Sequence, residues 1–83
     1  MTATTYFTAM GVEQNDSGFF VAVDGIQVLS ANDAIAAAQR LAHTHMGAVA
    51  FSRQGDLETG EFADAVELAK FGELPDDLSS IFA

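Results

Sequence analysis

Two clusters of turn-forming residues divide this chain into segments that alternate between strand and helix character. The first cluster, residues 15–18, reads Asn-Asp-Ser-Gly, and the second, residues 56–60, reads Asp-Leu-Glu-Thr-Gly. Each cluster lies between segments rich in apolar residues, a pattern typical of β-hairpins. A stretch without glycine or proline, residues 30–46, lies between these regions. The order of these segments predicts two hairpins joined by one helix.

The first hairpin is expected to pair residues 4–13 with residues 19–23, since both segments are rich in β-branched and aromatic residues. With residues 15–18 as the loop, Val12 lies opposite Val21, and Met10 lies opposite Val23. The Asp24-Gly25 dipeptide then predicts a bend or bulge, after which residues 26–29 continue as strand.

The clearest helix is expected at about residues 31–46. Ser30 is a good N-cap residue, and Asp33 lies in the first turn, where the helix dipole favours an anion. Apolar residues recur at spacings of three and four along it and predict one buried stripe: Ala34, Ile35, Ala38, Leu41, Ala42 and His45. Gly47 is expected to end the helix.

Residues 61–71 fit two interpretations. Their helix propensity is high, and Gly72 could cap a helix. The residues of the 56–60 cluster, however, suit a hairpin loop in which Gly60 supplies a left-handed conformation. Pairing Asp56 with Glu61 brings Phe51 opposite Val66, and Val49 opposite Leu68, so that large apolar residues share a face. We therefore predict strands at residues 48–54 and 62–71.

These elements predict one α+β domain spanning residues 1–83. It contains an antiparallel sheet of four to five strands in ββαββ order, with the main helix on one face. A short C-terminal helical turn is expected after Pro75. The face expected to meet the helix carries Tyr6, Met10, Val12, Val21, Val23, Val49, Phe51, Val66 and Leu68.

The opposite face is the candidate interface. One helix covers only one side of a sheet, so apolar residues on the other side form an exposed patch, which usually marks a protein interface. The residues expected there are Phe7, Phe20 and Phe71, with Leu78, Ile81 and Phe82 from the C-terminal segment. We expect a homodimer through this face or through a sheet edge.

Charge and composition narrow the range of partners and compartments. Twelve acidic residues and three basic residues give a net charge of −9, which repels nucleic acids and anionic membranes, and neither is an expected partner. The chain has no cysteine, no long apolar run and no basic N-terminal leader, so a cytoplasmic protein without disulfides is expected.

Candidate chemistry is sparse. The two histidines, His43 and His45, are two positions apart and lie about 200° apart around a helix, so they do not hold one metal ion together. One is expected in solvent and the other at the core edge. Asp56, Glu58 and Glu61 could bind a cation in the loop, although their spacing is not that of an EF-hand. No serine lies in a Gly-x-Ser-x-Gly elbow. We expect no enzyme, cofactor or metal.

Residues 47–62 and 64–78, with the alanine-rich helix before them, resemble a group of short proteobacterial proteins of unknown function. This resemblance implies a stand-alone bacterial protein and transfers no functional residue. Residues 6–42 are also similar in element order to HicB antitoxins, including Gly18-Phe19-Phe20 and the helix entry at Ser30. The Pro-Gly-Cys-like segment of that family and its DNA-binding extension are missing, so this similarity concerns topology alone.

Three functions remain open from the sequence. The first is a small non-enzymatic protein-interaction or accessory protein, expected to associate with itself. The second is an acidic inhibitor or nucleic-acid mimic that binds a basic protein partner. The third is a small-ligand or cation-binding module that uses the loop at residues 55–62.

Overall fold

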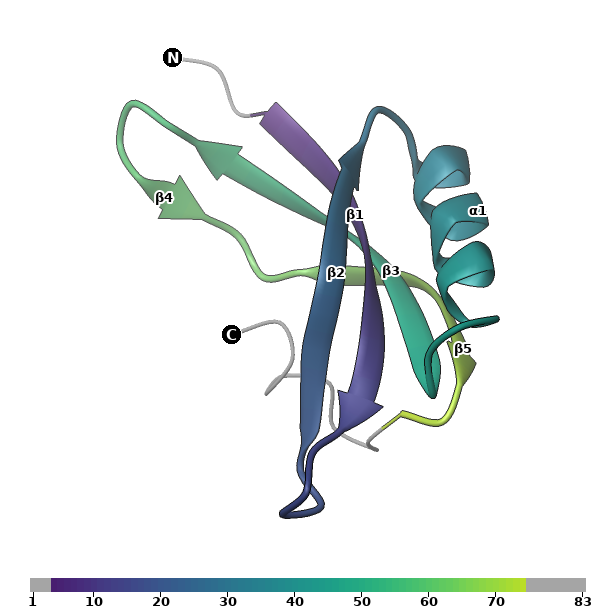
Figure 1. Ribbon diagram of the computed structural model, residues 1–83. Helices are drawn as coiled ribbons and strands as arrows, with labels where there is room; N and C mark the ends of the chain where they lie inside the picture. Colours follow the sequence, from purple (N-terminus) through teal and green to yellow (C-terminus); the bar gives the residue numbers. More distant parts are fainter. Residues whose placement is uncertain (1–3, 75–83) are drawn as a thin grey trace.

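The computed structural model describes residues 4–74 and contains a five-stranded antiparallel sheet with one helix on one face (Figure 1). The elements are β1 (Thr4–Gln14), β2 (Phe20–Val28), α1 (Ala31–Leu41), β3 (Gly47–Asp56), β4 (Glu61–Phe62) and β5 (Val66–Gly72). The strand order is β2-β1-β3-β4, and β5 also pairs with β3. The predicted α+β class is confirmed, but the last predicted strand is split in two. The expected C-terminal helical turn lies outside the described residues.

The β1–β2 hairpin forms as expected but in a different register. Asn15 closes the turn, because its N–H donates to the carbonyl of Phe19 and its side chain accepts from the N–H of Phe19. Phe19 therefore belongs to the turn, and Val12 pairs with Ala22 rather than with Val21. This shift of one residue changes which β1 side chains share a face with the β2 side chains near the turn. Val21 lies opposite Glu13 and no longer shares a face with Val12.

Helix α1 begins as predicted and ends early. The hydroxyl of Ser30 accepts a hydrogen bond from the N–H of Asp33 at 3.1 Å, which is the expected N-cap. The helix ends at Leu41 rather than near residue 46. The N–H groups of Thr44 and His45 both donate to the carbonyl of Leu41, so residues 42–45 curl into a tight turn.

Alanines form the contact between helix and sheet. The buried residues of this cluster are Ala9, Ala34, Ala37, Ala38, Ala48 and Ala50. Their small side chains let the helix lie close to β1 and β3. Larger residues surround the alanines and close the edges of the contact: Phe7, Val28, Ile35, Leu41, Leu68 and Phe71.

Strands β1 and β3 present to the helix the face opposite to the predicted one, whereas Val21, Val23 and Leu68 lie on the helix side as predicted. Phe7 and Phe71, which we expected on the side away from the helix, pack against the alanine cluster. Val12 and Val49, which we expected under the helix, lie in a separate cluster with Met10, Phe20 and Leu74. The prediction was wrong because it placed the larger side chains under the helix, whereas the narrow alanine stripe of α1 packs best on the sheet face with the smallest side chains.

The β3–β4 turn confirms the predicted loop. Asp56 pairs with Glu61, Gly60 has a φ of 76°, and its N–H donates to the carbonyl of Asp56. A side chain at Gly55 would overlap the ring of Phe62, so glycine is required there for Phe62 to cover the strand.

Beyond this turn the predicted register is wrong. Phe51 pairs with Glu67 and Val49 pairs with Lys70, because the strand is interrupted at residues 63–65 and shifts again opposite Ala50 and Phe51. These irregularities bring Leu68, Ala69 and Phe71 against the helix cluster, where they complete its edge.

Candidate functional site

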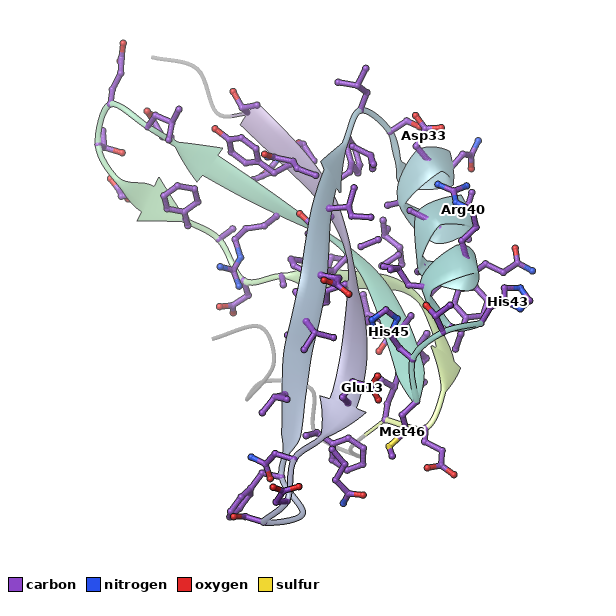
Figure 2. The ribbon with its side chains drawn as sticks, viewed as in Figure 1. Glu13, Asp33, Arg40, His43, His45 and Met46 are labelled. Atoms are coloured by element: carbon purple, nitrogen blue, oxygen red, sulfur yellow. The ribbon has the colours of Figure 1, made fainter. Side chains whose placement is uncertain are left out.

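A polar contact between two side chains joins the α1–β3 turn to strand β2. The Nε2 atom of His45 lies 2.8 Å from Oδ2 of Asp24, and its Nδ1 atom lies 2.9 Å from the carbonyl oxygen of Leu41. The side chain of His45 is 11% exposed and that of Asp24 is 67% exposed. Figure 2 shows His45 directed toward the sheet and His43 directed away from it. We call this contact the His45–Asp24 pair.

A glycine beside His45 and a left-handed backbone at Asp24 allow the two side chains to meet. A Cβ at Gly11 of β1 would lie 2.8 Å from the imidazole ring, so the ring of His45 rests on a strand position that has no side chain. Asp24 has a φ of 53°, in the left-handed region that Asp tolerates better than most residues. The β1–β2 register shifts at this point, which confirms the predicted bulge at Asp24-Gly25.

The partners of His45 favour its protonated form. A carbonyl oxygen and a carboxylate oxygen accept hydrogen bonds, so the charged imidazolium, in which both ring nitrogens donate, satisfies both contacts. The hydrogen bond to Leu41 and then that to Asp24 raise the pKa of His45 above the ordinary value of 6.5, and partial burial opposes them. With both nitrogens donating, the ring acts as a cationic link and not as a general base.

Two further groups complete the surroundings of the ring. The hydroxyl of Thr44 lies 3.0 Å from Nδ1 of His45 and 3.4 Å from the carbonyl oxygen of Leu41, so it can accept from the ring and donate to the carbonyl. The carboxylate of Glu13 on β1 accepts a hydrogen bond from the N–H of Met46 at 3.2 Å and adds to the negative potential at His45. The turn is thus attached to both β1 and β2.

The candidate ligand residues do not form a metal site within residues 4–74, although Asp56 and Glu61 are cross-strand partners. His43 is exposed and His45 lies at the core edge, as expected. Asp56 is buried, and its carboxylate accepts from the N–H of Glu58 at 2.9 Å, so it stabilises the turn. Within residues 4–74, no three His, Cys, Asp or Glu side chains gather in a way that could hold a metal ion.

Exposed apolar side chains lie along strand β2 and on the two residues that flank it. The exposed fractions are 69% for Phe19, 37% for Val21, 42% for Ile26 and 93% for Leu29. Among residues 4–74, strand β2 pairs only with β1, so it is an edge of the described sheet. Ile26 lies opposite Ala9, and Val21 lies opposite Glu13, which puts both on the side that carries the helix. We call residues 19–29 with these side chains the β2 row.

The predicted interface residues lie elsewhere. Phe7 and Phe71 are partly buried against the alanine cluster, and Phe20 packs against Val12 and Val49. Leu78, Ile81 and Phe82 are outside the described residues. The predicted interface aromatics within residues 4–74 thus pack against core residues. The exposed large apolar residues are the four of the β2 row, with Leu57, Phe62 and Val66 elsewhere.

Two hollows lie near the β3–β4 hairpin, and one of them is on the sheet face opposite the helix. Its volume is about 490 Å³, and it is lined by Tyr6, Thr8, Gln27, Phe51, Arg53, Leu57 and Phe62. The rings of Tyr6 and Phe62 lie 6.4 Å apart and form part of its wall. The loop hollow at residues 54–63, which includes Asp56 and Glu61, has a volume of about 440 Å³.

Sequence reasoning missed the His45–Asp24 pair and the β2 row. The partners of the pair are 21 positions apart, and their contact depends on how the α1–β3 turn folds back on the sheet. One signal was present: the near-continuous apolar run at residues 19–29 contains a single charge, Asp24, in an otherwise strongly acidic chain.

Comparison of the chain with models of protein families, with curated proteins and with solved structures finds no match. The resemblances noted from the sequence therefore stay predictions. No helix within residues 4–74 has both the length and the apolar character that crossing a membrane requires.

Proposed function

We propose that this protein is a small, non-enzymatic interaction protein that associates with a second copy of itself through the β2 row. The observation that supports this proposal is the exposure of Phe19, Val21, Ile26 and Leu29 along one edge strand. Exposed apolar residues concentrated on one strand are typical of an interaction surface.

The β2 row is close to self-complementary. Asp24 is the middle residue of segment 19–29, and apolar residues lie on both sides of it. In an antiparallel arrangement of two copies around Asp24, Phe19 of one copy lies toward Leu29 of the other. These two side chains are the most exposed apolar residues of the row. A two-fold interface requires this matching of a surface with itself.

Charge also favours a second copy at this site. Segment 19–29 has one charged residue, and that residue is bonded to His45, although the whole chain has a net charge of −9. Two copies therefore meet at the β2 row with little direct repulsion. The other long edge strand, β5, carries Glu67 and Lys70, and charges of this kind protect an edge from pairing.

The test is the mass in solution of the purified chain at micromolar concentration, by size-exclusion chromatography with light scattering. We expect a dimer for the natural sequence and a monomer for Ile26→Lys, because a charged side chain in the middle of an apolar interface is costly. Leu57→Lys is the matched control, since Leu57 is 77% exposed and lies outside the β2 row.

Circular dichroism of both variants should match that of the natural chain, which shows that each variant still folds. A natural chain that stays monomeric at these concentrations contradicts the proposal. So does a Leu57→Lys variant that dissociates as fully as Ile26→Lys.

A further inference from the structure

The His45–Asp24 pair lies at the centre of the β2 row. Asp24 is the only charged residue of segment 19–29, and the His45 side chain reaches it from the α1–β3 turn. In a two-fold arrangement centred on this residue, the Asp24 side chains of the two copies are neighbours. Like charges that face one another across paired strands are destabilising.

We propose that His45 sets the pH range in which two copies associate, because its positive charge cancels that of Asp24 within the interface. This inference rests on the proposed function and adds its control by pH. When His45 carries its proton, each copy presents a neutral pair at the centre of the β2 row. When His45 loses its proton, each copy presents a carboxylate without a counter-charge.

The bulge itself does not depend on the proton. Val21 and Val23 precede the bulge, and Ile26 and Val28 follow it. All four lie opposite β1 residues of one face. Val23 and Ile26 are three positions apart but pair with β1 residues two positions apart, so β2 needs an extra residue at positions 24–25 to keep them on that face. Loss of the proton therefore removes the ion pair with His45 and leaves the charge of Asp24 without a counter-charge. The apolar side chains before and after Asp24 stay in place.

The charged groups around the ring all act in the same direction. Among residues 4–74, Asp24 on β2 and Glu13 on β1 are the charged groups that act on His45. The end of α1 and the turn contribute the Leu41 carbonyl and the Thr44 hydroxyl. When His45 is neutral, the carboxylates of Asp24 and Glu13 lose the positive charge near them, and both favour the protonated ring.

The test measures the dimer dissociation constant by sedimentation equilibrium at about pH 6 and about pH 8.5, at constant ionic strength. Histidines titrate over this range, whereas Asp and Glu side chains stay ionised. For the natural chain we expect the dissociation constant to rise about tenfold at the higher pH, within the usual range of coupling between two sites.

Three variants isolate the pair. Asp24→Asn keeps a residue that tolerates the left-handed backbone and removes the negative charge, so its dimer should not weaken at the higher pH. His45→Gln lacks the positive charge, so its dimer should be weak at both. His43→Gln is the matched control, because His43 is exposed and directed away from the sheet, and it should keep the natural response.

The outcomes separate this inference from the proposed function. A natural dimer whose dissociation constant is the same at both pH values overturns the inference and leaves self-association intact. A pH response that persists in Asp24→Asn also overturns it. A natural chain that is monomeric at both pH values overturns the inference together with the proposed function.

Discussion

At Gly11, a single methyl group would decide whether the His45–Asp24 pair can form. A Cβ there would approach the ring of His45 to 2.8 Å, so Gly11→Ala must push the ring away from Asp24 and from the Leu41 carbonyl. We expect Gly11→Ala to lower the free energy of unfolding by about 1–3 kcal/mol, as other overpacked positions do. Denaturant unfolding followed by circular dichroism measures this change.

Gly25→Ala is the control for that substitution. A Cβ at Gly25 meets no other atom within 4 Å, and this residue lies in the same bulge as Asp24. Its stability should stay within about 0.5 kcal/mol of the natural chain. Equal losses at Gly11 and Gly25 would show that the contact with the ring is not responsible.

The proton on His45 makes stability depend on pH. Its pKa is raised in the folded chain, so its contribution to stability is fully present below the ordinary value of 6.5. That contribution is lost as the pH rises through the raised pKa of the folded state. We expect the unfolding midpoint of the natural chain to fall relative to that of His45→Gln as the pH rises. Proton NMR titration should give His45 a higher pKa than that of a free histidine.

At the residue scale, the sequence revealed the locations of single groups but not their partners. The placement of one histidine in solvent and one at the core edge is confirmed, although the two histidines lie in the turn after α1 and not in the predicted helix. The contact with Asp24 was not predictable, because it depends on the tight turn at residues 42–45 and on the left-handed backbone at Asp24.

Among the elements, helix α1 depends most on the size of its buried side chains. Ala38 is fully buried against the sheet, whereas Ala36 is exposed on the same helix. We expect Ala38→Leu to lower the free energy of unfolding by about 1–3 kcal/mol, since the helix must move away from β1 and β3. Ala36→Leu, the matched control, should change it by less than about 0.5 kcal/mol. Thermal and denaturant unfolding of both variants measure the difference.

The order of β1, β2, α1 and β3 could be predicted, because caps and turns have strong local signals, but the division of the last predicted strand into β4 and β5 could not. Ser30, Asn15 and Gly60 each make the local contact expected of them. The face of β1 and β3 that meets α1 could not be predicted, and the β1–β2 register differs because Phe19 belongs to the turn. The preference of a helix for the smaller face is a packing effect between distant segments, which periodicity within one segment does not reveal.

For the whole molecule, the net charge predicts how salt affects association. Two copies with a charge of −9 each repel one another at long range, and added salt screens this repulsion. We therefore expect the dimer dissociation constant to fall as sodium chloride is raised from about 50 mM to about 500 mM. Light scattering over a dilution series at each salt concentration measures it. Binding to a basic partner would show the opposite dependence and would favour the acidic-inhibitor alternative.

Strand β3 pairs with β1, β4 and β5, so the sheet is assembled around a segment in the second half of the chain. During synthesis, β1, β2 and α1 emerge before β3. Ala48 and Ala50 of β3, which complete the alanine cluster between helix and sheet, therefore emerge last. A nascent chain that ends before β3 therefore has a hairpin and a helix but no closed core. The apolar side chains of β2 are exposed throughout that interval, and so a ribosome that pauses before residue 47 would prolong the period in which neighbouring chains can aggregate.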